Sequence, residues 1–447
     1  MKCNPRSRVE EEVLEAIRPT RFQLRLLSRF LGLLESTLSR CLDKSGYEYK
    51  ILPVGSYAKG TITSYKWELD VFILLRGVSD EWILSNGERL LRGCLEDKLP
   101  VVVKYAQHPY VTVSLSGVEA DIVPAVWVDR PRRKGLGVER TPFHTEYVTR
   151  RLTDCLRDDV RLFKSFLKGL GVYGAETGIR GFSGYLAELL IIHYGGFHNL
   201  LEEASRWKPP VYIDPEGRGD RGLLERKYRD SPIIVVDPVD PERNAAASVE
   251  ARSLATLIAA SKFYLRRPSR DYFYPFNGKS PILHPGPVVT VDCWGSYESL
   301  PPDAVRGLAL RASRSLAEEL ERRGYPVTLY SYSTDEHDWV RVEVGVLSKQ
   351  IPEYARAPGP YAWDEDWRVA RFAEKRAGRG EPLWIGPDGR LYGARRIPQE
   401  RAIYVVYDWL EGPGRGILRG ERCIPRIVEC PGDAELCRPV PSWMAPS

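Results

Sequence analysis

The chain contains 447 residues, of which 43% are hydrophobic and 28% are charged, and its formal net charge is +5 at pH 7. This balance is typical of a folded globular protein and excludes wholesale disorder, while the length predicts about three domains. The small positive charge does not by itself identify a nucleic-acid-binding protein. No apolar run is long enough to span a membrane and no apolar leader follows Met1, so we expect a cytoplasmic protein without a membrane segment.

Eight cysteines are scattered through the sequence, at Cys3, Cys41, Cys94, Cys155, Cys293, Cys423, Cys430 and Cys437. None of them forms a CxxC pair, which argues against a zinc site built on that motif. The last three, Cys423, Cys430 and Cys437, are evenly spaced and have no histidine nearby, so we expect plain thiols there, with a disulfide as the alternative.

The first part of the chain has the pattern of an α+β fold. Apolar residues at helical spacing predict two helices within residues 10–42, and Pro19 separates them. A helix is predicted over residues 81–95, amid five short runs typical of β-strands: 49–54, 69–75, 101–105, 111–115 and 118–123. Because these strands are clustered and do not alternate regularly with helices, we expect an α+β fold.

The remainder begins with a helical region and continues with mixed elements. Residues 149–197 have helical periodicity, interrupted by a glycine-rich turn at 169–184. A proline-rich stretch at 266–287 predicts a domain boundary. The other predicted elements are helices over 252–263 and 304–323, and strands over 339–347 and 402–410.

Three carboxylates are the most informative residues. Glu68 and Asp70 open a predicted strand, and because side chains alternate along a strand, both point to the same face. Asp121 lies in another predicted strand. Converging carboxylates repel one another unless a cation lies between them, and such oxygen ligands suit Mg²⁺ ions that promote phosphoryl or nucleotidyl transfer.

The simpler alternative is that Glu68 and Asp70 are surface charges at the mouth of a strand. The turn Gly55-Ser56, which precedes them, favours the functional interpretation. Its glycine lets the backbone approach a phosphate closely, and the Ser56 hydroxyl can donate to a phosphate oxygen.

This pattern resembles the nucleotidyltransferase superfamily with a polymerase-β-like palm, and more closely the archaeal, class I CCA-adding enzymes (tRNA nucleotidyltransferases). The matching segments run in family order from about residue 50 to about residue 250: VGSYAKGT, ELDVFILL, QHPYV, VEADIVPA, RTPFH, VRLFKSFLKGLGVYGAE, RGFSGYLAELLI and VVDPVDPERNAAA. The C-terminal 200 or so residues match more loosely, with PGPYAW among the clearer points.

The resemblance implies a multidomain α+β protein that adds and repairs the 3′-terminal CCA of tRNA from CTP and ATP. The reaction would be a template-independent, two-metal nucleotidyl transfer with Mg²⁺ as cofactor and pyrophosphate as product. The implied domains are a catalytic head over 1–148, a helical neck over 149–265 that completes the nucleotide pocket, and a body and tail over 266–447. The last of these would bind the acceptor stem and TΨC arm of tRNA, and relatives suggest a homodimer.

The resemblance also implies roles for individual residues: Glu68, Asp70 and Asp121 would hold the metals, Ser56 and Lys59 would contact the triphosphate, His144, Lys164 and Tyr173 would complete the pocket, and Arg243 would help to read the base. His108 and Thr141 lie in matching motifs. Where many relatives have arginine this chain has Lys59, which keeps the charge but lacks the two-pronged guanidinium. From the residues alone, Lys164 reads as a solvated lysine, Tyr173 as packing, His144 as a turn residue and Arg243 as a surface ion-pair partner.

Two basic stretches are candidates for RNA binding. One is the loop residues Arg130, Arg132, Arg133 and Lys134, with a merely solvated charge run as the alternative. In the other, basic and aromatic residues interleave on one predicted helix: Arg368, Arg371, Lys375, Arg376 and Arg379 with Trp363, Trp367 and Phe372. Such a helix can hold an RNA backbone and stack bases, although an amphipathic helix with an aromatic core face has the same pattern.

Two other functions remain open from the sequence. One is another enzyme of the superfamily, such as a poly(A) polymerase or a sensor that forms oligoadenylates or cyclic nucleotides; the RTPFH and VYGAE segments favour the CCA-adding enzymes over these. The second is an RNA-binding protein with an inactive palm, against which the presence of all three carboxylates argues.

Overall fold

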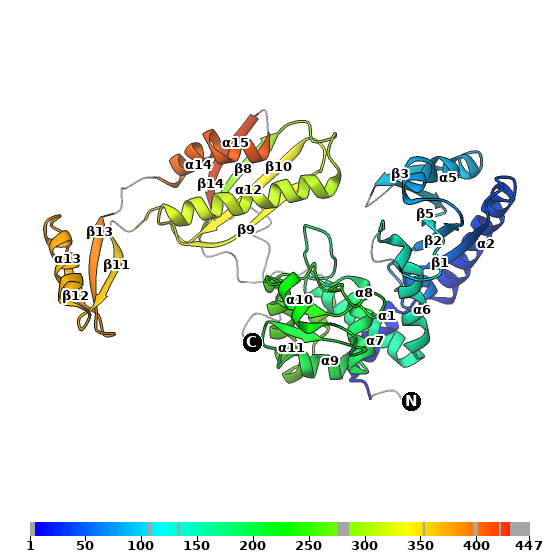
Figure 1. The fold of residues 1–447 in the computed structure, drawn as a ribbon, viewed down its shortest axis with the longest axis horizontal. Coiled ribbons are helices and arrows are strands. Elements are labelled where there is room, and N and C mark those ends of the chain that lie inside the picture. The colour runs from blue at the N-terminus through cyan, green and yellow to red at the C-terminus, as the bar shows by residue number, and fades with distance from the viewer. Residues whose placement is uncertain are drawn as a thin grey trace. The chain divides into compact units, whose positions relative to one another are not determined.

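The computed structural model describes residues 5–105, 109–131, 135–274, 286–351, 354–396, 401–419 and 422–429. The chain divides into two compact units, the first holding the described residues up to 274 and the second those from 286 onward. Both contain helices and sheets, which confirms the predicted α+β class (Figure 1). None of the described helices is both long and apolar enough to cross a bilayer.

The first unit begins with the two predicted helices, α1 (Arg8–Ile17) and α2 (Arg21–Leu42). Ser7 caps α1 and forms a reciprocal capping box with Glu10. Thr20 caps α2 by accepting from a backbone N–H in the first turn. Pro19 lies between the helices, as the sequence predicted.

All five strands predicted within residues 49–123 are present. They are β1 (Tyr49–Val54), β2 (Glu68–Leu75), β3 (Val101–Tyr105), β4 (Pro109–Leu115) and β5 (Val118–Val126). Their order in the sheet is β1-β2-β5-β4-β3, and β2–β5 is its parallel pair (Figure 1). The predicted 81–95 helix forms as α4 (Asp80–Trp82), a π-helical turn (Ile83–Gly87) and α5 (Glu88–Leu95).

The two faces of this sheet have different roles. On one face Leu69, Val71 and Ile73 of β2 pack in a core with Leu34 of α2 and Leu91 of α5. The side chains that alternate with these, beginning with Glu68 and Asp70, therefore point to the opposite face of the sheet. Packing against α2 and α5 fixes the register of β2, because a shift by one residue would turn the carboxylates into the core.

The helical region predicted from residue 149 is also present. It contains α6 (Thr141–Arg151), α7 (Asp154–Gly169), α8 (Gly184–Tyr194), α9 (Phe197–Ala204), α10 (Arg221–Lys227) and α11 (Ala251–Arg266). Two short parallel strands, β6 (Val211–Ile213) and β7 (Ile233–Val235), accompany the helices. Residues of α1, α7, α8, α9 and α11 share one buried core.

The second unit is built on a sheet in the order β14-β8-β10-β9, from β8 (Pro287–Trp294), β9 (Val327–Thr334), β10 (Trp339–Val346) and β14 (Arg422–Glu429). Helices α12 (Pro302–Arg322), α14 (Ala402–Glu411) and α15 (Pro413–Leu418) share its core. The smaller sheet β11-β13-β12 contains β11 (Tyr354–Tyr361), β12 (Leu383–Ile385) and β13 (Arg390–Arg396), with α13 (Asp366–Ala377) nearby in sequence.

The strand predicted over residues 402–410 is wrong, because this segment is helix α14. Its buried residues are Ala402, Val405, Val406 and Trp409, which have the i, i+3, i+4, i+7 spacing of a helix. The β-branched and aromatic composition favoured a strand, but packing of the apolar face decided the conformation.

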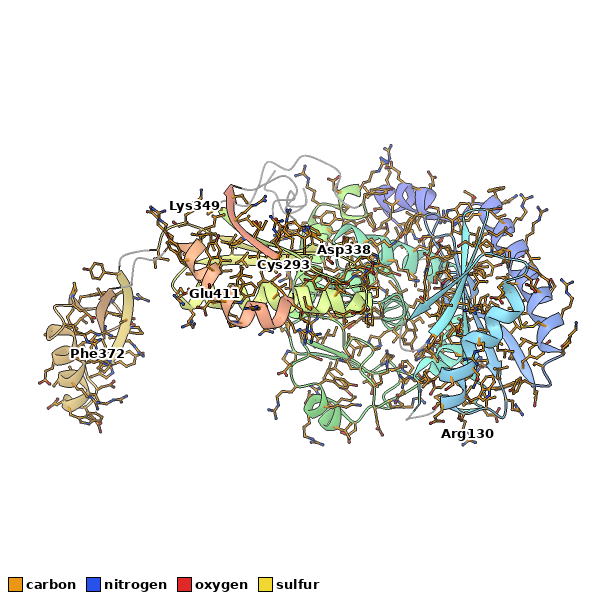
Figure 2. The ribbon with its side chains drawn as sticks, turned by 90° about the horizontal axis from the view of Figure 1, so that it is seen from above. Arg130, Cys293, Asp338, Lys349, Phe372 and Glu411 are labelled. Atoms are coloured by element: carbon orange, nitrogen blue, oxygen red, sulfur yellow. A yellow bond between two sulfur atoms is a disulfide. The ribbon has the colours of Figure 1, made fainter. Side chains whose placement is uncertain are left out.

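The expectation of a plain thiol is wrong at Cys423, where the alternative of a disulfide is correct. Cys41 of α2 is joined to Cys94 of α5. Cys293 of β8, which is labelled in Figure 2, is joined to Cys423 of β14. No described cysteine is a free thiol, whereas Cys3, Cys430 and Cys437 lie outside the described residues. The partners are 53 and 130 residues apart, so their pairing could not be read from local spacing.

Candidate active site

The Gly-Ser turn lies directly beside an acidic residue of the sheet. Strand β1 ends at Val54, which pairs with Asp70 of β2, and a single helical turn, α3 (Gly55–Ala58), follows. Gly55 has φ +66°, and a Cβ there would lie 1.8 Å from Asp70 Oδ2, so no other residue fits. The Ser56 Oγ is buried and has no hydrogen-bond partner in the described part of the chain. Such a group needs a partner, and a ligand oxygen can supply it.

Asp70 and Asp121 face each other across the parallel strands β2 and β5. Both point away from the core that the sheet shares with α2 and α5. Thr112 fixes Asp121 by donating its hydroxyl to Oδ1 at 2.6 Å. Glu68 points to the same face but is half-exposed, and its Oε2 lies 2.8 Å from the Lys66 Nζ. The strands therefore bring Asp70 and Asp121 together, while Lys66 holds the third carboxylate.

The electrostatics of these residues suit a divalent cation. Burial raises the pKa of Asp70; Lys66 opposes this effect, while Asp121 and Glu68 add to it. A cation between the carboxylates would remove that repulsion, and the donors are the oxygen ligands that Mg²⁺ prefers. Across the described ranges, no group of three His, Cys, Asp or Glu side chains is already gathered as a ligand set. The chemistry of Asp70 and Asp121 fits such a metal, while Glu68 is paired with Lys66.

Two lysines converge on one buried carboxylate. Lys59 follows α3, Lys164 lies on α7, and their Nζ atoms lie 2.8 Å from opposite oxygens of Glu188 on α8. Thr61 donates its hydroxyl to Glu188 Oε1 at 2.8 Å and accepts from Lys164 at 3.0 Å. Burial alone would raise the pKa of Glu188, but the two lysines outweigh it and lower the pKa to about 2. The alternative of a solvated Lys164 is wrong, because this side chain is 6% exposed.

Tyr173 lies close to this lysine pair. A Cβ added at Gly184, the first residue of α8, would lie 2.9 Å from the Tyr173 hydroxyl and 3.8 Å from the Lys164 Nζ. Gly184 therefore leaves room beside both polar groups. The Lys168 Nζ lies 5.4 Å from the Tyr173 ring and 4.0 Å from the Tyr65 ring. Burial raises the pKa of Tyr173 to about 12, so its hydroxyl remains a hydrogen-bond donor near neutral pH.

A second buried carboxylate, Asp237, gathers the two remaining candidates. Its Oδ2 lies 2.9 Å from His144 Nε2 and 2.7 Å from Arg243 Nη1, and Tyr185 donates to Oδ1 at 2.9 Å. The His144 ring stacks on the Tyr185 ring at 4.1 Å. Burial lowers the pKa of His144, although Asp237 partly opposes this effect. Arg243 is thus an ion-pair partner of a buried acid, with its side chain 36% exposed.

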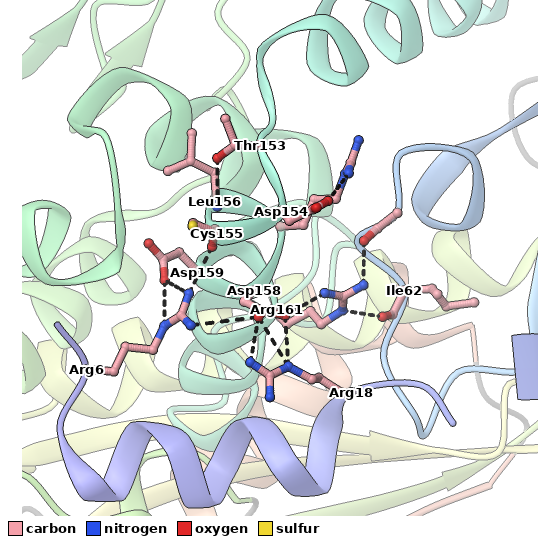
Figure 3. Close-up of polar contacts among 12 residues, drawn as sticks. Arg6, Arg18, Ile62, Thr153, Asp154, Cys155, Leu156, Asp158, Asp159 and Arg161 are labelled. Carbon is pink, nitrogen blue, oxygen red and sulfur yellow. Dashed lines mark hydrogen bonds and ion pairs between the residues drawn. The ribbon is translucent and has the colours of Figure 1, made fainter. Parts of the chain in front are cut away.

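The loop after α3 is anchored by helix α7. Arg161 donates from Nε to the Ile62 carbonyl at 2.8 Å and from Nη2 to the Gly60 carbonyl at 2.5 Å (Figure 3). Asp158 orients Arg161 through a 2.8 Å contact and also binds Arg18, which follows α1. These contacts fix the backbone on either side of Thr61.

The structure places all nine predicted site residues in the first unit, in three groups: Ser56 with Glu68, Asp70 and Asp121; Lys59 with Lys164 and Tyr173; and His144 with Arg243. The Lys59 Nζ connects the last two groups, since it lies 5.4 Å from the Tyr185 ring. Thr141 is the first residue of α6, and its carbonyl accepts from the Thr145 hydroxyl. His108 lies outside the described residues.

Sequence reasoning missed both carboxylates that organise these groups. Glu188 had a signal, because a charged residue in the otherwise apolar helix α8 needs a buried partner. Asp237 follows the buried strand β7 and is fully buried, but its segment contains other acidic residues with similar surroundings in the sequence.

The basic and aromatic residues near α13 form an exposed surface in the second unit. None of the described side chains of α13 is buried, and Trp367 is 60% exposed, whereas Phe372 is half-buried and lies against Gly359 of β11. The alternative of an aromatic core face is therefore wrong for Trp367. A cavity of about 700 Å³ is lined by residues that include Trp367, Arg368, Arg371 and Phe372. Trp363 and Arg379 lie outside the helix. Of the basic loop, Arg130 is described, whereas Arg132, Arg133 and Lys134 are not.

Two family models match the chain: a nucleotidyltransferase domain over residues 34–157, and the second domain of tRNA nucleotidyltransferase over residues 158–274. The CCA-adding enzyme of Aeropyrum pernix is 48% identical over 392 residues, which cover 87% of this chain and 84% of that protein. The CCA-adding enzymes of Sulfurisphaera tokodaii and Saccharolobus solfataricus are 37% and 35% identical, each over 87% of this chain and 88% of the relative. All nine site residues lie within the region that the two family models match.

Proposed function

The chain belongs to the family of CCA-adding enzymes, and we propose from this membership that it adds and repairs the CCA sequence at the 3′ end of tRNA. It is a tRNA nucleotidyltransferase that uses CTP and ATP, needs no nucleic-acid template and releases pyrophosphate. The observation that carries this assignment is the 48% identity with the Aeropyrum enzyme, which extends over 87% of the chain. Asp70 and Asp121, beside the Gly-Ser turn, supply matching chemistry.

Asp70, Asp121 and Glu68 would hold Mg²⁺. When bound, the metal would lower the pKa of the attacking 3′-hydroxyl and stabilise charge on the departing pyrophosphate. The Ser56 hydroxyl, which is unpartnered among the described residues, would donate to a phosphate oxygen. The fixed turn at Gly55 places this donor beside Asp70, so that the α-phosphate is held against the carboxylates.

The lysine group would bind the rest of the triphosphate. Lys59 and Lys164 supply positive charge close to the turn, and Tyr173 supplies a neutral hydroxyl donor. In a site of low dielectric constant, such preorganised donors stabilise developing charge without reorganisation. Arg243, partly exposed and held by Asp237, would contribute to reading the base, with His144 beside it.

We assign the three domains as a catalytic head over 1–148, a neck over 149–265 and a tRNA-binding body and tail over 266–447. The exposed aromatic and basic residues on α13 support the last role, because such side chains bind RNA backbone and stack on bases. The partner regions would be the acceptor stem and TΨC arm, which every tRNA shares. We also propose a homodimer.

A primer-extension assay tests the proposal. Purified protein is given a tRNA transcript that lacks CCA, with Mg²⁺ and CTP, ATP or both. We expect two additions with CTP alone and a halt after three with both nucleotides. Open-ended adenylation would instead identify a poly(A)-type transferase, and tRNA binding without any incorporation would identify a non-catalytic RNA-binding protein.

A further inference from the structure

We propose that Glu188 is a positioning residue for the nucleotide triphosphate, acting through Lys59 and Lys164. It would hold the two ammonium groups side by side beneath the triphosphate without touching the nucleotide itself. This inference rests on the proposed function, because it takes the triphosphate of CTP or ATP as the ligand of the lysine group.

The geometry engages both carboxylate oxygens of Glu188. Oε2 lies 2.8 Å from the Lys59 Nζ, and Oε1 lies 2.8 Å from both the Lys164 Nζ and the Thr61 hydroxyl. The three polar partners come from two separate parts of the chain, the loop after α3 and the helix α7. Charge-assisted hydrogen bonds of this length are strong and directional, so one carboxylate fixes the relative positions of both cations.

Burial makes the carboxylate necessary. The side chains of Lys59, Lys164 and Glu188 are 8%, 6% and 2% exposed. Two ammonium groups this close and this buried would repel each other without an anion between them. With Glu188 present the group carries two positive charges and one negative charge, and its net charge of +1 still attracts a polyanion.

The number of N–H donors on the two lysines allows them to bind phosphate while they remain bound to Glu188. Each ammonium group has three N–H donors. Lys164 directs two of them to Glu188 and Thr61, and Lys59 directs one to Glu188, within the described part of the chain. The remaining donors, together with the Tyr173 hydroxyl, are available for phosphate oxygens.

The packing of α8 gives no other reason for an acid at this position. The neighbours Ala187 and Leu189 are fully buried, and the helix is apolar through this stretch. Replacing a whole buried ion-pair group by well-packed apolar residues is often neutral or stabilising, so stability does not require an acid and two lysines here. We therefore attribute the negative charge of Glu188 to its role in holding the ammonium groups of Lys59 and Lys164.

The test compares the full-length protein with the variant Glu188→Gln, which keeps the shape of the side chain but removes its charge. The affinities for CTP and for CMP, each with Mg²⁺, are measured by calorimetry. We expect a roughly 10- to 100-fold loss for CTP, the range for losing hydrogen bonds to a charged group. The affinity for CMP, which lacks the β- and γ-phosphates, should change less than about threefold.

Asp159→Asn provides the matched control. Asp159, on α7, is also a buried acid that binds a cation: Arg6 Nη2 lies 2.9 Å from its Oδ1, and it contacts neither lysine. This variant should keep the wild-type preference for CTP over CMP even if its thermal stability falls. An equal loss of CTP and CMP affinity in Glu188→Gln, or an unchanged preference, would show that Glu188 is merely structural.

Glu188→Asp covers the case in which Glu188→Gln does not fold. It retains the charge, but the shorter side chain cannot reach both lysines, so the CTP preference should fall several-fold; an unchanged preference would overturn the proposal. The primer-extension assay on the wild-type protein separates the two hypotheses. A protein that adds no CCA but loses its CTP preference in these variants would overturn the proposed function and leave the role of Glu188 intact.

Discussion

Replacing Gly55 with alanine is expected to reduce CCA addition by about 100-fold or more. The new Cβ would lie 1.8 Å from Asp70 Oδ2, so that oxygen must move by about 1.6 Å to reach ordinary contact at 3.4 Å. A misplacement of about 1 Å in a catalytic group costs roughly 100-fold in rate. Asp70 cannot keep its position opposite Asp121 while making this movement.

Lost stability would not account for such an effect. Gly55 has φ +66°, and an alanine in this left-handed region costs about 1–2 kcal/mol. Native proteins are typically stable by about 5–15 kcal/mol, so the variant should remain folded. The loss of rate would therefore come from the displaced carboxylate.

Gly46→Ala separates the two causes. Gly46 has φ +76° with no atom within 4 Å of an added Cβ, so it has the same backbone cost without the collision. Single-turnover CMP addition and urea unfolding are measured for both variants. We expect similar losses of stability and a loss of rate in Gly55→Ala alone. Equal rates in the two variants would refute the close approach of the Gly-Ser turn to Asp70.

The remaining predictions concern other parts of the chain. Asp70→Ala should abolish addition while tRNA binding, measured by gel shift, stays largely intact; a parallel loss of binding would indicate a structural role. Since the lysines lower the pKa of Glu188 to about 2, its stabilising effect should be complete above the ordinary carboxyl pKa of 4.5 and vanish as the pH falls toward 2. Urea unfolding at pH 6 and pH 3 should accordingly show a smaller acid loss in Glu188→Gln than in the wild type, and equal losses would contradict this. Replacing both Cys41 and Cys94 with alanine should lower the free energy of unfolding by about 2–4 kcal/mol without slowing addition at low temperature, and an unchanged value would mean that the bond contributes nothing. Trp367→Ala should weaken tRNA binding by about 1–3 kcal/mol and leave CTP affinity unchanged; intact tRNA binding would remove α13 from the RNA surface.

The strand pattern predicted the acidic face well. Alternation in β2 places Glu68 and Asp70 on one face, and the structure adds the parallel register that brings Asp121 opposite Asp70. This part was predictable because it depends on local periodicity. The wrong strand at 402–410 also came from a local pattern. There the β-branched composition favoured a strand, the spacing of the apolar residues favoured a helix, and the structure has a helix.

The two organising carboxylates were not predictable in this way. Glu188 meets Lys59 across 129 residues, and Asp237 meets His144 across 93 residues. No local pattern encodes such pairings, which arise only when helices and loops are packed in three dimensions. The disulfide between Cys293 and Cys423 is a similar case, since it joins strands 130 residues apart in the chain.

The anchoring of the loop by Arg161 bears on how such enzymes can be recombined. Gly60 and Ile62, whose carbonyls accept these bonds, lie in the segment that matches the nucleotidyltransferase domain, residues 34–157. Arg161, whose guanidinium donates them, lies in the segment that matches the second domain of tRNA nucleotidyltransferase, residues 158–274. A chimaera that joined the first segment of one relative to the second segment of another would have to inherit compatible partners on both sides. We expect a chimaera to be active when the loop and helix α7 come from the same parent. The unit to be exchanged is then this pair of elements, although the two lie in segments that match different family models.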